Sequence, residues 1–182
     1  LYKKESKELF SGIWEIYHTN GEIFQKILFT EGIENGHWQE FYANGQLKII
    51  GKLALGKEIG TWKTFFSNGI LQCIGLFENG EPIGLWKEYW PNGPIKARYF
   101  LVKDKGVDGL VENFFDNGSA STKEQYKNNQ RNGKWESYHE NGQLNSKGNY
   151  INDLKDGLWD YYSNNGLKLF SETYEEGKLI DR

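Results

Sequence analysis

One short pattern recurs along the 182 residues with a nearly constant spacing. The pattern Gly-x-Trp-x-x-aromatic-x-x-Asn-Gly occurs six times, and a degenerate seventh copy runs from Gly109 to Gly118. The first glycine of each copy stands at positions 12, 36, 60, 84, 109, 133 and 157, so five intervals are 24 residues and one is 25. Such a period indicates tandem structural repeats, each of which is too small to bury a core alone.

Each copy predicts a β-hairpin. In the third repeat, two strand-like runs at 62–66 and 71–77 flank Asn68-Gly69. Asn-Gly between two such runs favours a two-residue type I′ turn, in which both residues have positive φ. A second glycine-rich turn, such as 56–60, then leads to the next hairpin. The sequence therefore predicts an all-β meander.

The two-residue turn also predicts which residues lie opposite each other. A tryptophan pairs with a strand glycine in three hairpins, where an indole can cover exposed backbone: Trp38 with Gly51, Trp62 with Gly75, and Trp135 with Gly148. Other hairpins carry different pairs: Trp14 with Ile27, Trp86 with Tyr99, Val111 with Glu124, and Trp159 with Glu172. We expect the repeated tryptophans and turn glycines to be structural, namely Trp14, Trp38, Trp62, Trp86, Trp135, Trp159, Gly21, Gly45, Gly69, Gly93, Gly118, Gly142 and Gly166.

Composition limits the functions that such a chain can have. A net charge of -3, with lysines scattered among glutamates, argues against a nucleic-acid partner. Cys73 is the only cysteine, which excludes an internal disulfide and a multi-cysteine metal site. His18 and His139 hold one repeat position five repeats apart, and His37 stands alone, so we predict no metal site and no cofactor. No motif supplies a nucleophile with a base, and we predict that the protein is not an enzyme.

The residues 36–47, Gly-His-Trp-Gln-Glu-Phe-Tyr-Ala-Asn-Gly-Gln-Leu, resemble the unit of the MORN-repeat variant family, which in bacteria includes YwqK-type antitoxin proteins. The resemblance covers about residues 12–180. It implies an elongated, twisted or trough-shaped single-layer antiparallel sheet without a catalytic centre. Related proteins neutralise toxins, act as scaffolds or have been linked to lipid head groups. The whole chain, 1–182, is then one repeat array, with a partial segment at 1–11 and one additional residue in the link near 103–106.

A single layer leaves apolar surface uncovered, and such surface usually marks an interaction site. Tyr42, Phe66, Trp90 and Phe115 take equivalent places in consecutive repeats and are candidate partner-binding residues. The alternative interpretation is that these side chains form the core between hairpins. We expect the chain to bind a protein partner, and a toxin is the first candidate. The alternative is that the chain is a scaffold that self-associates through open sheet edges or binds lipid head groups. Membrane binding is disfavoured by the acidic charge. The compartment is left open, with the cytoplasm favoured and an exported or periplasmic location as the alternative.

Overall fold

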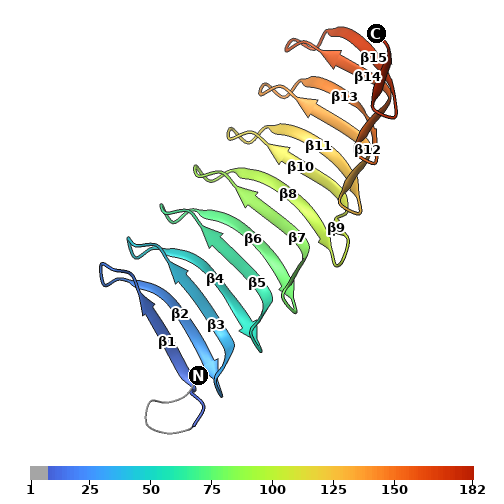
Figure 1. Ribbon diagram of the computed structural model, residues 1–182. Coiled ribbons are helices and arrows are strands. Elements are labelled where there is room, and N and C mark those ends of the chain that lie inside the picture. Colours follow the sequence, from blue (N-terminus) through green and yellow to red (C-terminus); the bar gives the residue numbers. More distant parts are fainter. Residues whose placement is uncertain (1–7) are drawn as a thin grey trace. The chain divides into compact units, whose positions relative to one another are not determined.

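The computed structural model describes residues 8–182, which form sixteen β-strands and no helix (Figure 1). The chain divides into two compact units, one reaching to Ile83 and including Pro91–Gly93, the other formed by Gly84–Trp90 and Pro94–Arg182. Within each unit, the strands pair antiparallel in the order of the chain, apart from one short strand of the second unit. The predicted all-β hairpin meander is therefore confirmed. Residues 1–7 of the predicted N-terminal segment lie outside the described residues.

The first unit contains six complete strands: β1 (Gly12–Tyr17), β2 (Ile23–Thr30), β3 (Ile33–Phe41), β4 (Leu47–Ala54), β5 (Lys57–Phe65) and β6 (Leu71–Glu78). Strand β7 (Glu81–Tyr89) begins in the first unit and continues in the second. The second unit then contains β8 (Ile95–Val102), β9 (Gly106–Val107), β10 (Gly109–Phe114), β11 (Ala120–Lys127), β12 (Gln130–Tyr138), β13 (Leu144–Ile151), β14 (Leu154–Tyr162), β15 (Lys168–Glu175) and β16 (Lys178–Asp181). The short β9 and the following β10 both pair with β8.

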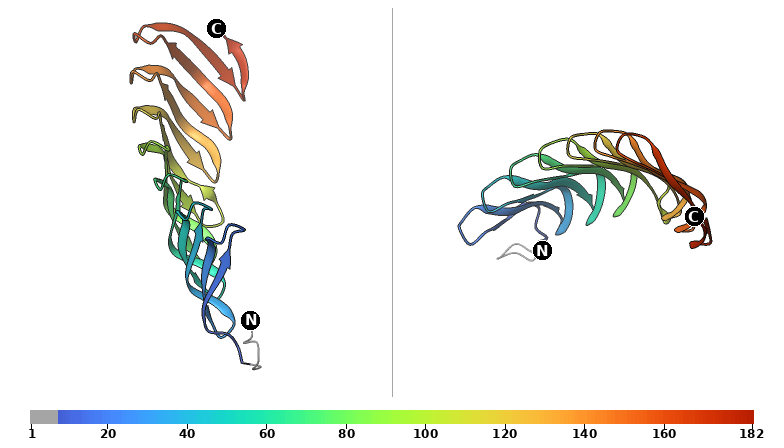
Figure 2. Two further views of the ribbon diagram at one scale, coloured as in Figure 1. Left: turned by 90° about the vertical axis from the view of Figure 1, so that its left-hand side faces the viewer. Right: turned by 90° about the horizontal axis from the view of Figure 1, so that it is seen from above.

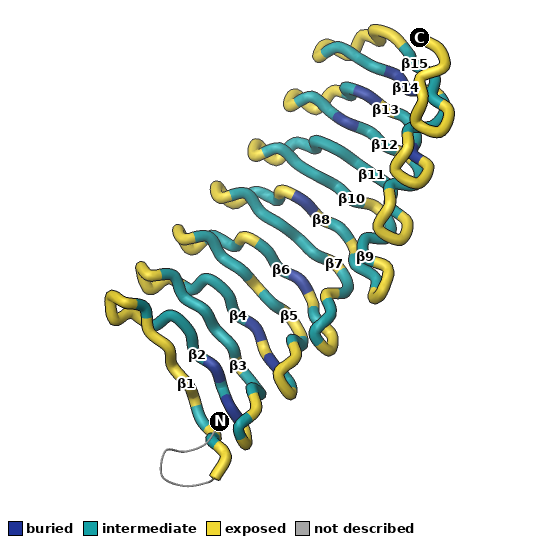
Figure 3. The backbone as a smooth tube through the Cα atoms, in the orientation of Figure 1, coloured by how far each residue is buried: buried dark blue, intermediate teal, exposed yellow. Residues whose placement is uncertain are grey.

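Each unit is a single layer of strands. Within residues 8–182, Figure 2 shows no second layer over either face of the strands in either unit. Burial is confined to a few strand positions, whereas the hairpin tips are exposed (Figure 3). The most buried apolar side chains are Ile27, Phe29, Leu53, Ala97, Tyr150 and Trp159. Side chains of neighbouring hairpins must therefore supply most of the apolar contacts.

The Asn-Gly tips are not the predicted two-residue type I′ turns. The Gly45 N–H donates to the Tyr42 carbonyl at 2.9 Å, and the Tyr42 N–H donates to the Gln46 carbonyl at 2.8 Å. The loop thus has three residues, 43–45, and of these only Gly45 has positive φ, at 80°. This is a type I turn followed by a left-handed glycine. The Asn44 side chain supports it, because its Oδ1 accepts a hydrogen bond from the Gln46 N–H at 3.1 Å.

The predicted register is nevertheless confirmed, because a bulge compensates for the longer loop. Phe41 pairs with Leu47, but the next pair is Glu40 with Ile49, so Lys48 has no opposite residue. One additional residue in the loop and one in the bulge restore the pairing of Trp38 with Gly51. The remaining predicted pairs also hold, namely Trp62–Gly75, Trp135–Gly148, Trp14–Ile27, Trp86–Tyr99, Val111–Glu124 and Trp159–Glu172.

The type I′ turns lie instead at the links between hairpins. Thr30 pairs with Ile33, and the two residues between them, Glu31 and Gly32, have φ of 50° and 76°. Positive φ at both central residues defines this turn type. The link before the fifth repeat differs, because Val102 pairs with Gly106 around three residues, 103–105. The additional residue predicted for that link is thus accommodated in its loop.

Candidate protein-binding surface

The tryptophans of each unit lie on one side of its sheet, here called the tryptophan face. The ring centroids of Trp38 and Trp62 are 5.4 Å apart in the first unit, and those of Trp135 and Trp159 are 5.1 Å apart in the second. A Cβ added to Gly51 would lie 2.1 Å from Cδ2 of Trp62. The indole that covers a strand glycine therefore comes from the next hairpin, and not from the glycine's own hairpin as the sequence suggested.

The same arrangement recurs in the second unit. A Cβ on Gly148 would lie 2.2 Å from Cδ2 of Trp159, whose side chain is almost completely buried. Each such indole packs on the strand glycine of the preceding repeat, so this glycine and the tryptophan of the next repeat depend on each other. The predicted structural role of Trp62 and Trp159 therefore has a specific geometric basis.

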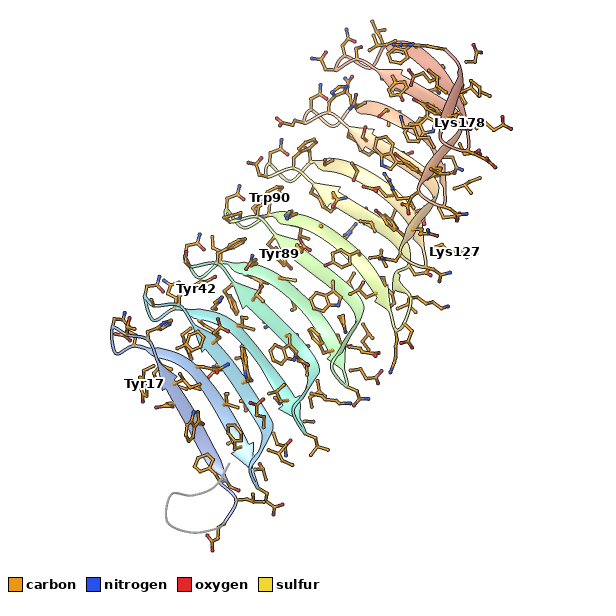
Figure 4. The ribbon with its side chains drawn as sticks, viewed as in Figure 1. Tyr17, Tyr42, Tyr89, Trp90, Lys127 and Lys178 are labelled. Carbon is orange, nitrogen blue, oxygen red and sulfur yellow. The ribbon has the colours of Figure 1, made fainter. Side chains whose placement is uncertain are left out.

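Two of the predicted partner-binding residues, Tyr42 and Trp90, connect adjacent hairpins. Both are half-buried near the hairpin tips (Figure 4). The Tyr42 hydroxyl donates to the Phe65 carbonyl at 2.7 Å, and Nε1 of Trp90 donates to the Phe114 carbonyl at 3.0 Å. Each side chain thus supplies a bond to the following repeat, in agreement with the alternative interpretation as core.

The other members of this position extend the comparison. Nε2 of His18 lies 3.0 Å from the Phe41 carbonyl, and Nε2 of His139 lies 3.1 Å from the Tyr162 carbonyl. Because a carbonyl accepts hydrogen bonds, these nitrogens carry the proton and donate. Phe66 and Phe115 are half-buried at the same position, but a phenyl ring has no such donor. Partner binding by Tyr42, Phe66, Trp90 and Phe115 stays a prediction.

A ladder of asparagines at the tips was not predicted from the sequence. Five tip asparagines donate from Nδ2 to a carbonyl of the next tip, each to a residue 23 positions further along the chain. The distances are 2.9 Å from Asn20 to Ala43, 3.1 Å from Asn44 to Ser67, 3.1 Å from Asn68 to Pro91, 3.5 Å from Asn117 to Glu140 and 2.6 Å from Asn141 to Asn164. The asparagine therefore closes its own turn and also bonds to its neighbour.

The side opposite the tryptophans, here called the opposite face, carries ion pairs beside exposed side chains. Glu15 accepts from Lys26 at 2.8 Å and from the Tyr17 hydroxyl at 2.6 Å, and Tyr17 is exposed near its hairpin tip (Figure 4). The bond from Lys26 is the main reason why the pKa of Glu15 is below its ordinary value. In the second unit, the Arg98 guanidinium bonds to Glu112 and lies over the Phe114 ring.

The second unit also holds two charged groups in confined surroundings. Nζ of Lys155 lies 4.3 Å from the ring centroid of Trp159 and 4.7 Å from that of Tyr174, and burial lowers its pKa. Asp160 is buried and accepts from Lys168 at 2.7 Å, and this bond is the main reason why its pKa is lowered. Both groups lie in contacts that stabilise the last hairpins.

Residues 8–182 contain no group of three His, Cys, Asp or Glu side chains that could hold a metal ion. They also contain no helix that is long and apolar enough to span a membrane. Cys73 is half-buried, opposite Thr64. The surface of the single-layer sheet carries exposed apolar side chains, which are typical of binding surfaces.

The fold and this surface define a tandem β-hairpin repeat protein. Comparison with known families agrees, because the model of the MORN repeat variant matches four segments, 10–31, 34–52, 58–79 and 131–152. These four segments are similar to the MORN-variant repeat. No curated protein matches the chain.

Proposed function

We propose that this chain is a non-catalytic repeat protein that binds another protein on its sheet surface. The observation that carries this proposal is the single-layer sheet, whose strands expose large apolar side chains within each unit. Ile13 and Leu85 show this clearly, because their side chains are 64% and 50% exposed. A repeat protein presents such surfaces without needing an enclosed pocket.

Neutralisation of a toxin is the form of binding that we place first. The motif resemblance supports it, since antitoxins occur among similar proteins. A neutralising protein needs a stable scaffold and an exposed contact surface, and no reacting groups. The match to MORN-variant repeats supports a binding role of this general kind.

The experiment that tests the proposed function is affinity capture from a lysate of the source organism, followed by an activity assay of the recovered protein. We expect one protein in a one-to-one complex, whose activity falls when the chain is added. A Phe66→His/Phe115→His variant tests the predicted partner-binding row, because His18 and His139 show that histidine fits this position. Recovery of no protein by the folded wild-type chain would contradict the proposed function.

A scaffold that self-associates through strand edges is the second candidate. Within residues 8–182, strand β1 pairs with β2 on one side only, so its other edge is available for pairing with a second chain. Sedimentation at increasing protein concentration separates this function from the first. Growing end-to-end assemblies, with no foreign partner, would place the scaffold first.

A further inference from the structure

One row of cross-strand pairs on the opposite face differs strongly between repeats. Seven pairs occupy this row, one in each hairpin: Ile13–Leu28, His37–Lys52, Thr61–Leu76, Leu85–Phe100, Leu110–Gln125, Lys134–Asn149 and Leu158–Thr173. Five of them contain at least one polar residue. The hairpin therefore does not require an apolar pair here, and the two fully apolar pairs need another explanation.

Three of the four side chains in these apolar pairs are exposed, and the fourth, Leu28, is half-buried. Ile13 is 64% exposed in the first unit, and Leu85 and Phe100 are 50% and 49% exposed in the second. Ile13 and Leu28 also line a shallow hollow with Ile27, Lys26 and His37. Burying such side chains in a partner would gain free energy that they do not contribute within the sheet.

A cationic rim accompanies each apolar pair. Lys26 and Lys52 lie on the strands around the first pair, where Glu15 is the one carboxylate in cross-strand pairing with them. Lys87 and Arg98 form a cross-strand pair beside the second, where Glu112 is the one carboxylate on Arg98. In each patch one cation is ion-paired, Lys26 with Glu15 and Arg98 with Glu112, and a second cation, Lys52 or Lys87, lies on a neighbouring strand position, in a chain of net charge -3. Complementary charge favours an acidic partner.

We propose that Ile13–Leu28 and Leu85–Phe100 are two docking patches for an acidic protein segment with an apolar anchor residue. This inference rests on the proposed function and names the partner's chemistry. The anchor packs on the apolar pair, and neighbouring carboxylates of the partner face the cationic rim. The same arrangement occurs once in each unit, on the opposite face and not on the tryptophan face.

The chain itself supplies the substitutions for a test. Threonine stands at the first position of this row in one repeat, and glutamine stands at the second position in another. The variant Ile13→Thr/Leu28→Gln/Leu85→Thr/Phe100→Gln removes both patches with residues that the hairpin tolerates. Leu158→Thr is the matched control, since it removes an exposed leucine from the same row. Circular dichroism and thermal unfolding verify that both variants fold.

The probe is a displayed library of random peptides, selected on the wild-type chain. We expect enrichment of peptides in which an apolar residue is flanked by Asp or Glu. Fluorescence anisotropy of an enriched peptide should show affinity weakened by about tenfold or more for the four-residue variant and unchanged for the control. Equal affinity for wild type and the four-residue variant, or a basic consensus, would overturn the inference.

The outcomes also separate the inference from the proposed function. Peptides or a captured protein that bind the four-residue variant as well as wild type overturn the docking patches and leave the binding function standing. If the wild-type chain self-associates through these pairs, sedimentation shows it, and the acidic partner is wrong. A wild-type chain that binds neither peptide nor protein contradicts both.

Discussion

The tip asparagine has two roles, and only one of them follows from its local sequence. Oδ1 of Asn44 closes the turn, which is a familiar property of asparagine. Nδ2 of Asn44 bonds to the Ser67 carbonyl of the next tip, and this partner comes close only when two hairpins have paired. Asn-Gly is therefore recognisable from the sequence as a turn, whereas the ladder is not.

Replacing Asn44 by aspartate separates the two roles. Asn44→Asp keeps the acceptor for the Gln46 N–H but loses the donor and places a carboxylate beside the Ser67 carbonyl. We expect the free energy of unfolding to fall by about 1 kcal/mol in urea denaturation. Asn165→Asp is the control, because within residues 8–182 the Asn165 amide accepts bonds but donates none. Equal losses at both positions would argue against the ladder.

Gly51 leaves room for the next tryptophan. Gly51→Ala places a methyl group where the Trp62 indole lies, so the indole must move. We expect a loss of about 1–3 kcal/mol in the free energy of unfolding, measured by chemical denaturation. Lys52→Ala, at the exposed neighbouring position, should change it by about 0.5 kcal/mol or less. A tolerated Gly51→Ala would mean that Trp62 does not pack there.

The Asp160 carboxylate makes the free energy of unfolding depend on pH in the acid range. Its pKa is lowered in the folded chain, chiefly by the Lys168 hydrogen bond, so the stabilisation is complete above the unfolded-state pKa and is lost as pH falls through the folded-state pKa. Asp160→Asn should therefore destabilise the protein at pH 7 and much less at about pH 2.5. Urea denaturation at both pH values measures this. A difference that stays constant between them would exclude the carboxylate as the cause.

At the scale of the hairpin, strand pairing was predictable and the turn types were not. Tryptophan spacing and Asn-Gly positions indicate the correct pairs, such as Trp38 with Gly51. They do not reveal that a three-residue loop and the bulge at Lys48 compensate each other. A two-residue turn without a bulge and a three-residue loop with a bulge give the same register beyond the bulge. The type I′ turns at the links carry varied residues such as Leu55-Gly56, which hides them in the sequence.

Exchanging leucine and asparagine between two link turns tests the turn assignment. Leu55 and Asn79 both precede glycine in link turns and have φ of 51° and 53°. Asparagine tolerates this left-handed conformation better than leucine. Leu55→Asn should raise the free energy of unfolding by about 0.5–1 kcal/mol, and Asn79→Leu should lower it by a similar amount. Thermal unfolding of both variants measures the changes, and a shift of the same sign in both would contradict the assignment of these turns.

At the scale of the whole molecule, one repeated hairpin explains stability and leaves surface for binding. Bonds such as Tyr42 to Phe65 and Trp90 to Phe114 stabilise neighbours within a unit. The sequence predicts a row of aromatics as partner-binding candidates, and two of them, Tyr42 and Trp90, make this structural bond. The apolar pairs Ile13–Leu28 and Leu85–Phe100 are not recognisable from the sequence, because they stand out only when the same row is compared across paired strands.

The central claim is that an exposed apolar sheet surface of this chain binds a protein. Titration calorimetry of the captured partner at several temperatures tests it most directly, because burial of apolar surface on binding gives a negative change in heat capacity. We predict one-to-one binding with a clearly negative heat capacity change that becomes smaller for Ile13→Thr/Leu28→Gln/Leu85→Thr/Phe100→Gln. Binding with no measurable heat capacity change, equal in wild type and variant, would contradict the claim.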